Sequence, residues 1–148
     1  MKYFLSLIFL SSCLIGEAQS SEDSVKASVN QLFTAMKNVD PALLVSSFAD
    51  SAILQTIINK DGKVQIRNEA VDDFASSIGK LQKDDADERI QFDVIKIDGA
   101  LAIVWAPYKF YYKGKFSHCG VDSFQMIRIN GKWKIQYLID TRRKDRCD

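Results

Sequence analysis

Apolar residues recur at spacings of three and four between residues 22 and 38, and this periodicity predicts an amphipathic helix. A second, short helix is expected to begin at Asp40-Pro41, because aspartate is a good N-cap and proline is tolerated in the first turn. A third helix is predicted over residues 68–81, with its cap at Asn68. The apolar face of the first helix comprises Val25, Val29, Leu32, Phe33 and Met36.

Alternating apolar and polar residues predict strands in the rest of the chain. Residues 51–58 form one strand, which turns at Asp61-Gly62 and returns over residues 63–67. The acidic run 84–88 is expected to be a solvated loop. Four longer strands follow, separated by the turns Asp98-Gly99, Lys113-Gly114 and Asn130-Gly131; they cover residues 89–97, 100–112, 115–129 and 132–141. Helices followed by an antiparallel meander indicate an α+β fold.

Two-residue turns fix the register of a meander as long as no bulge intervenes. In that register Asp122 lies between Trp105 and Ile139 on neighbouring strands. One face of the sheet is then mostly apolar and should pack against the helices; it includes Phe92, Ile103, Trp105, Lys109, His118, Asp122, Phe124 and Tyr137. The opposite face is more polar, and it is expected either to be solvated or to pair with a second copy of the chain.

Asp122 is the most informative residue of the predicted inner face. An unpaired carboxylate among apolar side chains is costly, so it needs a donor, a cavity or a position outside the core. Asp122 and His118 are the candidates for proton transfer, with Tyr137 as a hydrogen-bond donor. Lys109 and Arg143 should flank His118. The alternative is that Asp122 has a purely structural hydrogen bond and that His118 lies at the rim.

Composition narrows the possible functions. The 148 residues leave room for one ordinary domain. Lys and Arg number 20 against 19 Asp and Glu, which argues against nucleic acid as the main partner. The chain has 1 His and no close spacing of metal ligands, so no zinc site is expected. No cofactor is expected either.

The first residues are typical of a secretory signal. An apolar run over residues 3–15 follows Lys2 and is too short to span a bilayer as a helix. Cleavage after Ala18 would leave an exported domain of residues 19–148, periplasmic or secreted. The alternative is a lipoprotein anchored at Cys13, which ends a segment similar to a lipobox.

Removal of this leader leaves two cysteines. In an oxidising compartment Cys119 and Cys147 are expected to form a disulfide, which would stabilise the fold by about 3 to 4 kcal/mol. The alternative is two free thiols too far apart to join. The short basic tail after Thr141 is either solvated or in contact with an anion near His118.

The order of elements resembles the nuclear-transport-factor-2-like superfamily, which includes ketosteroid isomerase, scytalone dehydratase and the SnoaL-like polyketide cyclases. The segment Asn130-Gly131-Lys132-Trp133-Lys134-Ile135 resembles the final-strand signature (Gly-x-Trp-x-Ile) of its small exported bacterial members, some of which are labelled "putative lumazine-binding". The resemblance implies a cone-shaped fold in which three N-terminal helices pack on a curved, mainly antiparallel sheet. It also implies a ligand pocket inside the cone and a homodimer formed through the outer sheet face.

Three functions are consistent with these observations. The first is binding of a small apolar or aromatic molecule, with contacts from Trp105, Phe124, Lys109, Arg143, Ile103 and Phe92. The second is a cofactor-independent lyase or isomerase that uses Asp122 as general base, assisted by His118 or Tyr137. The third is a homodimeric interaction module with a filled core. The resemblance alone does not choose among them, because one fold hosts many functions.

Overall fold

The computed structural model describes residues 20–60 and 62–147. The predicted signal peptide, residues 1–18, and the alternative lipidation at Cys13 lie outside the described residues. Within them the chain has three helices and seven strands. No helix in the described part of the chain is long and apolar enough to cross a membrane.

The first two helices form as predicted. Helix α1 spans Ser21–Asn38, and the Ser20 hydroxyl oxygen accepts a hydrogen bond from the backbone N–H of Asp23. Helix α2 spans Pro41–Ser46 and is capped by the Asp40 carboxylate. Helix α3 is shorter than predicted and spans Val71–Ile78.

Helix α3 begins late because Asn68 does not cap it. Asn68 and Glu69 instead extend strand β2, where they pair with Gln55 and Leu54 of β1. The Asn68 side chain accepts a hydrogen bond from the Gln55 amide at 2.7 Å. Pairing with a neighbouring strand therefore outweighs the local helix-start signal.

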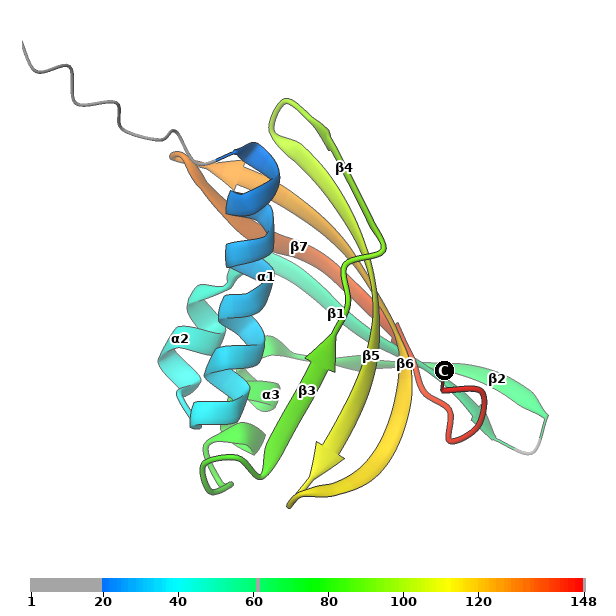
Figure 1. Cartoon of the computed structure of the whole chain (residues 1–148). Helices are drawn as coiled ribbons and strands as arrows, with labels where there is room; N and C mark the ends of the chain where they lie inside the picture. Colours follow the sequence, from blue (N-terminus) through cyan, green and yellow to red (C-terminus); the bar gives the residue numbers. More distant parts are fainter. Residues whose placement is uncertain (1–19, 61, 148) are drawn as a thin grey trace, which may run out of the picture.

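One sheet contains all seven strands, in the order β2-β1-β7-β6-β5-β3, with β4 also paired to β5. The strands are β1 Phe48–Lys60, β2 Lys63–Glu69, β3 Ala86–Ile90, β4 Val94–Asp98, β5 Leu101–Tyr112, β6 Lys115–Ile129 and β7 Lys132–Thr141. All pairs are antiparallel except β1 with β7. The sheet curves around the helices, which cover its concave face (Figure 1). The α+β cone expected from the sequence is confirmed.

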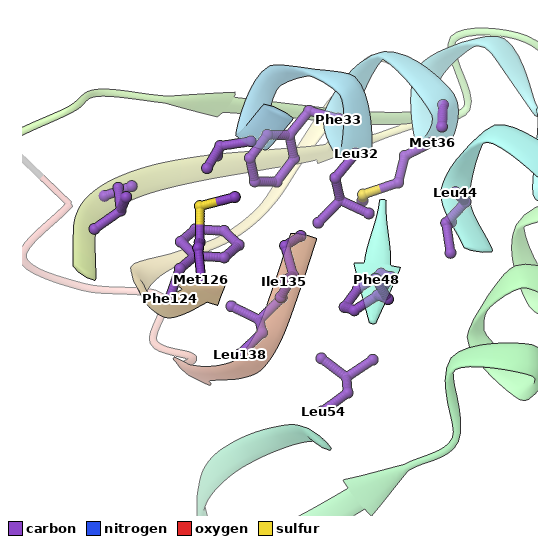
Figure 2. Packing of buried hydrophobic residues seen from close by; sticks show 14 of the residues in the cluster. Leu32, Phe33, Met36, Leu44, Phe48, Leu54, Phe124, Met126, Ile135 and Leu138 are labelled. Atoms are coloured by element: carbon purple, nitrogen blue, oxygen red, sulfur yellow. The ribbon is translucent and has the colours of Figure 1, made fainter. Parts of the chain in front are cut away.

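The hydrophobic core fills the space between α1 and the concave face. Leu32, Phe33 and Met36 point from α1 toward the sheet, where Phe124 and Ile135 are fully buried (Figure 2). The rings of Phe33 and Phe124 meet edge to face, 6.3 Å apart. Burial of each such side chain contributes roughly 1.5 to 3 kcal/mol.

A bulge in β6 changes the predicted register with β5. Phe110 pairs with His118 but Tyr111 pairs with Phe116, so Ser117 is an extra residue. Beyond this bulge Asp122 lies opposite Ala106 instead of Trp105. The prediction that Ile103, Trp105 and Lys109 face the interior is therefore wrong; the concave face takes Ala102, Val104, Ala106 and Tyr108 instead.

A second bulge has the same effect on β7. Met126 pairs with Ile135 and Gln125 pairs with Tyr137, which leaves Gln136 as the extra residue. Tyr137 consequently faces outward, and its hydroxyl donates a hydrogen bond to the side-chain amide oxygen of Gln55 at 2.7 Å. The prediction that Tyr137 assists Asp122 from inside the cone is wrong. Asp140 takes the inward position opposite Asp122.

The acidic run is a loop, as predicted, only at residues 84–85; from residue 86 it is a strand. Residues 86–90 form β3 against β5, and the predicted strand 89–97 is divided between β3 and β4. Asp87 is buried and forms ion pairs with Lys37 at 3.1 Å and with Arg89 at 2.8 Å. Pairing these charges makes their burial tolerable.

The predicted disulfide joins Cys119 of β6 to Cys147 in the C-terminal tail, with Cα atoms 5.7 Å apart. Cys119 also pairs with Arg143 through two backbone hydrogen bonds of 2.9 Å. The tail is thereby held against the convex side of the sheet, opposite the helices (Figure 1).

Candidate functional site

A group of carboxyl side chains lies inside the cone, where most neighbours are apolar. Glu88 of β3, Asp122 of β6 and Asp140 of β7 line a cavity of about 50 Å³ between the helices and the sheet. Asp122 and Asp140 are 3% and 6% exposed, and Glu88 is partly accessible. Leu32, Met36, Phe74 and Leu138 supply the apolar wall.

The register of the sheet explains this convergence. The β6–β7 pairing places Asp122 directly opposite Asp140, and the β5–β6 pairing places the small Ala106 on the other side of Asp122. Partners in an antiparallel sheet project to the same face. The register therefore brings Asp122 and Asp140 side by side on the concave face.

Asp140 has two donors on one of its oxygens. The Arg142 Nε donates to Asp140 Oδ2 at 2.8 Å, and the single hydroxyl hydrogen of Tyr108 is shared between the same oxygen at 3.1 Å and the Thr141 carbonyl oxygen at 2.9 Å. Arg142 also donates to the Thr56 hydroxyl oxygen at 3.2 Å. Burial, and next the negative charge of Asp140, raise the pKa of Tyr108, so its hydroxyl remains a donor. Asp140 is therefore a compensated carboxylate.

Asp122 and Glu88 form a different kind of pair. Their carboxyl groups lie within hydrogen-bonding reach of each other. Burial raises the pKa of Asp122 well above its usual range, and the negative charge of Glu88 raises it further. Burial also raises the pKa of Glu88, to about 7. Two carboxyls this close share a proton near neutral pH, because both cannot ionise at low cost.

Asp122 Oδ2 is buried and has no hydrogen-bond partner among the described residues. Such an atom is uncommon in folded proteins and calls for a specific explanation. It belongs to a carboxyl that lines the cavity beside a proton-sharing neighbour. The pair can accept one hydrogen bond and donate another, or transfer a proton to a bound molecule.

His118 faces the same side of β6 as Asp122, as predicted, but it does not line this cavity. Its ring packs against Phe110 at 5.0 Å and Tyr108 at 5.7 Å, and its Nδ1 lies 3.0 Å from the Ser117 hydroxyl. Burial lowers the pKa of His118, so the ring is mostly neutral at pH 7. A role for His118 in proton transfer stays a prediction.

The six predicted ligand contacts are distributed over three regions. Phe124 and Phe92 face inward, but Phe124 is fully buried in the core and Phe92 packs at its edge. Ile103 and Trp105 are 44% and 47% exposed on the convex face. Lys109 and Arg143 lie opposite Cys119, not beside His118, and line a pocket outside the cone. None of the six lines the cavity at Asp122.

Sequence reasoning missed the residues that surround Asp122, namely Glu88, Tyr108, Asp140 and Arg142. The acidic neighbours of Glu88 suggest a loop, and a register without bulges puts Tyr108 and Asp140 on the opposite face from Asp122. Asp140 carries one usable signal, since it is the one acidic residue of the final strand, Lys132–Thr141.

The convex face is more apolar than predicted. Exposed apolar side chains follow β4 and β5, and we call them the convex apolar row; they are Val94, Leu101, Ile103 and Trp105. Scattered exposed apolar residues are ordinary, but a contiguous row on one sheet face is typical of an interaction surface.

No group of three His, Cys, Asp or Glu side chains suited to a metal ion occurs within residues 20–60 and 62–147. The groups around the cavity are hydrogen-bonding and proton-transferring groups. They suit a small organic molecule that carries at least one polar atom.

Family comparison supports the same fold. The family model described as "Putative lumazine-binding" matches residues 20–137. The chain belongs to this family. No curated protein matches it. The matched region ends before Asp140 and Arg142, so these two of the polar residues around the cavity lie outside it.

Solved structures of nuclear-transport-factor-2-like (NTF2-like) proteins resemble the chain in fold. One from Shewanella baltica OS155, of unknown function, has 14% identity and a TM-score of 0.65, with 84% of this chain and 94% of that one covered. A cystatin-like protein of unknown function from Nostoc punctiforme has 10% identity and a TM-score of 0.65, covering 85% and 95%. A protein from Streptomyces avermitilis described as "a putative dehydratase from the NTF2-like family" has 13% identity and a TM-score of 0.59, covering 82% and 94%.

Proposed function

We propose that the protein binds a small, partly apolar molecule in the cavity between helices and sheet, with the Glu88–Asp122 pair recognising its polar group. The observation that carries this proposal is the buried Asp122 Oδ2, which has no partner within the described residues. A carboxyl in this state costs stability unless the proton shared with Glu88, a ligand or a water satisfies it. Proteins retain such costs mainly at functional sites.

The size of the cavity limits how the ligand is held. Its volume of about 50 Å³ compares with one or two waters, each of which occupies about 30 Å³ in the liquid. Pockets for drug-sized ligands have about 300 to 1,000 Å³. The ligand therefore inserts one polar group beside Asp122, and its apolar part displaces Phe74 of α3 or the flexible Met36.

The test is native mass spectrometry of the full chain, expressed with its leader and purified without denaturation. We expect a retained small molecule that is lost in Asp122→Asn and kept in Asp93→Asn, which changes an exposed carboxyl. A ligand retained equally by both variants would contradict the proposal, and so would a ligand-free protein that no compound stabilises against heat.

A second candidate function is favoured by the raised pKa values of the pair. A carboxyl that ionises near neutral pH is suited to remove a proton from a carbon or hydroxyl acid. In this lyase or isomerase mechanism the Glu88–Asp122 pair takes up the proton that is removed, and the Tyr108 side chain lines the same cavity. The retained molecule should then exchange a carbon-bound hydrogen for deuterium in D₂O. Asp122→Asn should abolish this exchange. If the wild-type protein shows no exchange, the lyase or isomerase function is contradicted and only the binding function stands.

The convex apolar row supports an additional proposal, a homodimer formed through the convex sheet face. Trp105 and Ile103 lie at its centre, and packing them against a second copy removes apolar surface from water. Sedimentation should show a dimer that Ile103→Lys dissociates. Val45→Lys is the matched control, because Val45 is similarly exposed at 40% but lies on α2. A wild-type monomer at high concentration would contradict this proposal.

We also propose that the protein is exported. The disulfide is compatible with an oxidising compartment, where such bonds persist. N-terminal sequencing of the mature protein should begin at Gln19 if the leader is cleaved as proposed. An acylated Cys13 at the N-terminus would instead show the lipoprotein alternative.

A further inference from the structure

A second pocket lies on the convex side of the sheet, away from the carboxyl cluster. It has a volume of about 210 Å³ and is formed where β3, β5 and β6 meet the C-terminal tail. Pro107 and Lys109 line it from the outward positions of β5. The tail forms the remaining wall through Arg143 and Cys147.

The charged side chains that line this pocket are basic. Arg89, Lys109 and Arg143 line it, and no acidic side chain does so in the part of the chain that the structure describes. Arg89 is partly compensated by its ion pair with buried Asp87. Among the described residues, no ion pair involves Lys109 or Arg143. Cations gathered in a concave site attract anions more strongly than the same cations dispersed over a surface.

The pocket also offers flat apolar surface. Pro107 contributes aliphatic atoms, and the Arg89 guanidinium stacks on the ring of Tyr111, 4.2 Å from the ring centre. A guanidinium held on an aromatic ring keeps its orientation and still presents N–H groups at its edge. These features favour an anion attached to a planar apolar body over a bare inorganic ion.

The fold fixes the position of the tail wall. Arg143 exchanges two backbone hydrogen bonds of 2.9 Å with Cys119, and its Nε donates to the Arg146 carbonyl at 3.0 Å. The Cys119–Cys147 disulfide closes the wall four residues further along. A cation placed by backbone pairing and a covalent bond is better ordered for binding than one on a free tail.

We propose that this pocket binds a small organic anion, with a carboxylate held between Lys109 and Arg143 and a planar apolar body against Pro107 and Tyr111. Arginine and lysine side chains are the usual partners of carboxylates, through charge-assisted hydrogen bonds. The volume lies below that of drug-sized pockets, so the ligand is about the size of a single substituted ring. This site is independent of the function proposed for the cone, since the sheet separates the two.

The test uses the full mature chain, labelled with ¹⁵N and titrated with benzoate, benzamide and inorganic phosphate. Benzamide matches benzoate in shape but has no charge. We expect saturable benzoate shifts at the amides of Lys109, Gly120 and Arg143, with a Kd on the order of 1 mM for so small a ligand. Benzamide and phosphate should each bind at least about tenfold more weakly, because each lacks one of the two features recognised.

Variants assign the binding to this pocket. Lys109→Gln and Arg143→Gln should each raise the Kd for benzoate at least about fivefold, as expected when a charge-assisted hydrogen bond is lost. Lys96→Gln should leave it unchanged, because Lys96 is an exposed cation of β4 that does not line the pocket. Unperturbed amide positions elsewhere show that each variant is folded.

Two results would overturn the proposal: benzoate and benzamide binding equally well, or the Lys109 and Arg143 variants binding like the wild type. Phosphate binding as tightly as benzoate would overturn the organic character of the ligand. Asp122→Asn should not change benzoate binding, so failure here and failure of the cone site are distinguishable.

Discussion

The concave and convex faces of the sheet hold their charged side chains in different environments. On the concave face, acidic groups are buried, and they are tolerated because Arg142 neutralises Asp140 while Glu88 and Asp122 share a proton. On the convex face, the cations Lys109 and Arg143 stay exposed and keep their charge in water. Burial therefore selects groups that can lose or pair their charge, whereas exposure allows charges to remain available for a ligand.

At Gly120 the backbone of β6 lies close to the end of β7 and to the Tyr108 ring. A Cβ atom at this position would lie 1.7 Å from the Thr141 carbonyl oxygen and 2.7 Å from Cε1 of Tyr108. Gly120→Ala should therefore force the end of β7 away from β6 and reduce the free energy of unfolding by about 3 kcal/mol or more. Urea unfolding measures this loss, with Gly79→Ala as the control because its new Cβ meets only the Pro41 side chain within 3.4 Å. A cost below about 1 kcal/mol at Gly120 would mean that the strands are not this close.

Removing the disulfide tests how far the stability of the fold and the pocket on the convex side depend on the C-terminal tail. Its loop of 28 residues predicts a loss of about 3 kcal/mol in the Cys119→Ala/Cys147→Ala double variant. The loss should appear in urea unfolding. The same variant should bind benzoate more weakly, because Arg143 is then less well ordered. Unchanged stability after reduction of the disulfide would contradict its stabilising role.

Adjacent residues of β5 test the bulged register directly. Val104 is 2% exposed on the concave face and Ile103 is 44% exposed on the convex face. Val104→Ala should cost roughly 1 to 3 kcal/mol, and Ile103→Ala about 0.5 kcal/mol or less in the monomer. Thermal or urea unfolding at low protein concentration measures both. The unbulged register predicts the reverse order, so the pair decides between them.

The smallest expected effect is a gain of stability in the variant Asp122→Asn. The raised pKa values mean that the folded protein binds more protons than the unfolded chain from about pH 4.5, where Glu88 normally titrates, to about pH 7 and above. The free energy of unfolding therefore falls as pH rises through this window. Asp122→Asn should flatten this dependence and stabilise the protein at pH 8 by about 1 to 2 kcal/mol.

Urea unfolding at pH 5 and pH 8 measures this difference. Asp93→Asn, at an exposed position, should keep the wild-type dependence on pH. A loss of stability in Asp122→Asn at pH 8 would instead mean that Asp122 is ionised and serves the structure, as in the alternative considered from the sequence.

Much of the secondary structure followed from local patterns. The turn at Asn130-Gly131 has positive φ at both residues, 50° and 79°, as expected for a type I′ hairpin. The long strands on either side of it were predicted with the bounds that the structure has. The prediction of a loop is wrong for residues 86–88 because charge suggests exposure, and the burial of Asp87 depends on Lys37, which is 50 residues away in the chain.

The sequence by itself determined the α+β class, the order of the elements, the cysteine pair and the inward direction of Asp122 on β6. Each depends on local periodicity, on a turn residue or on parity within one strand. Only the tertiary structure decided which residues surround Asp122. One extra residue in β6 and one in β7 reverse the faces of the neighbouring segments, since side chains alternate along a strand, and no local pattern marks Ser117 or Gln136 as extra.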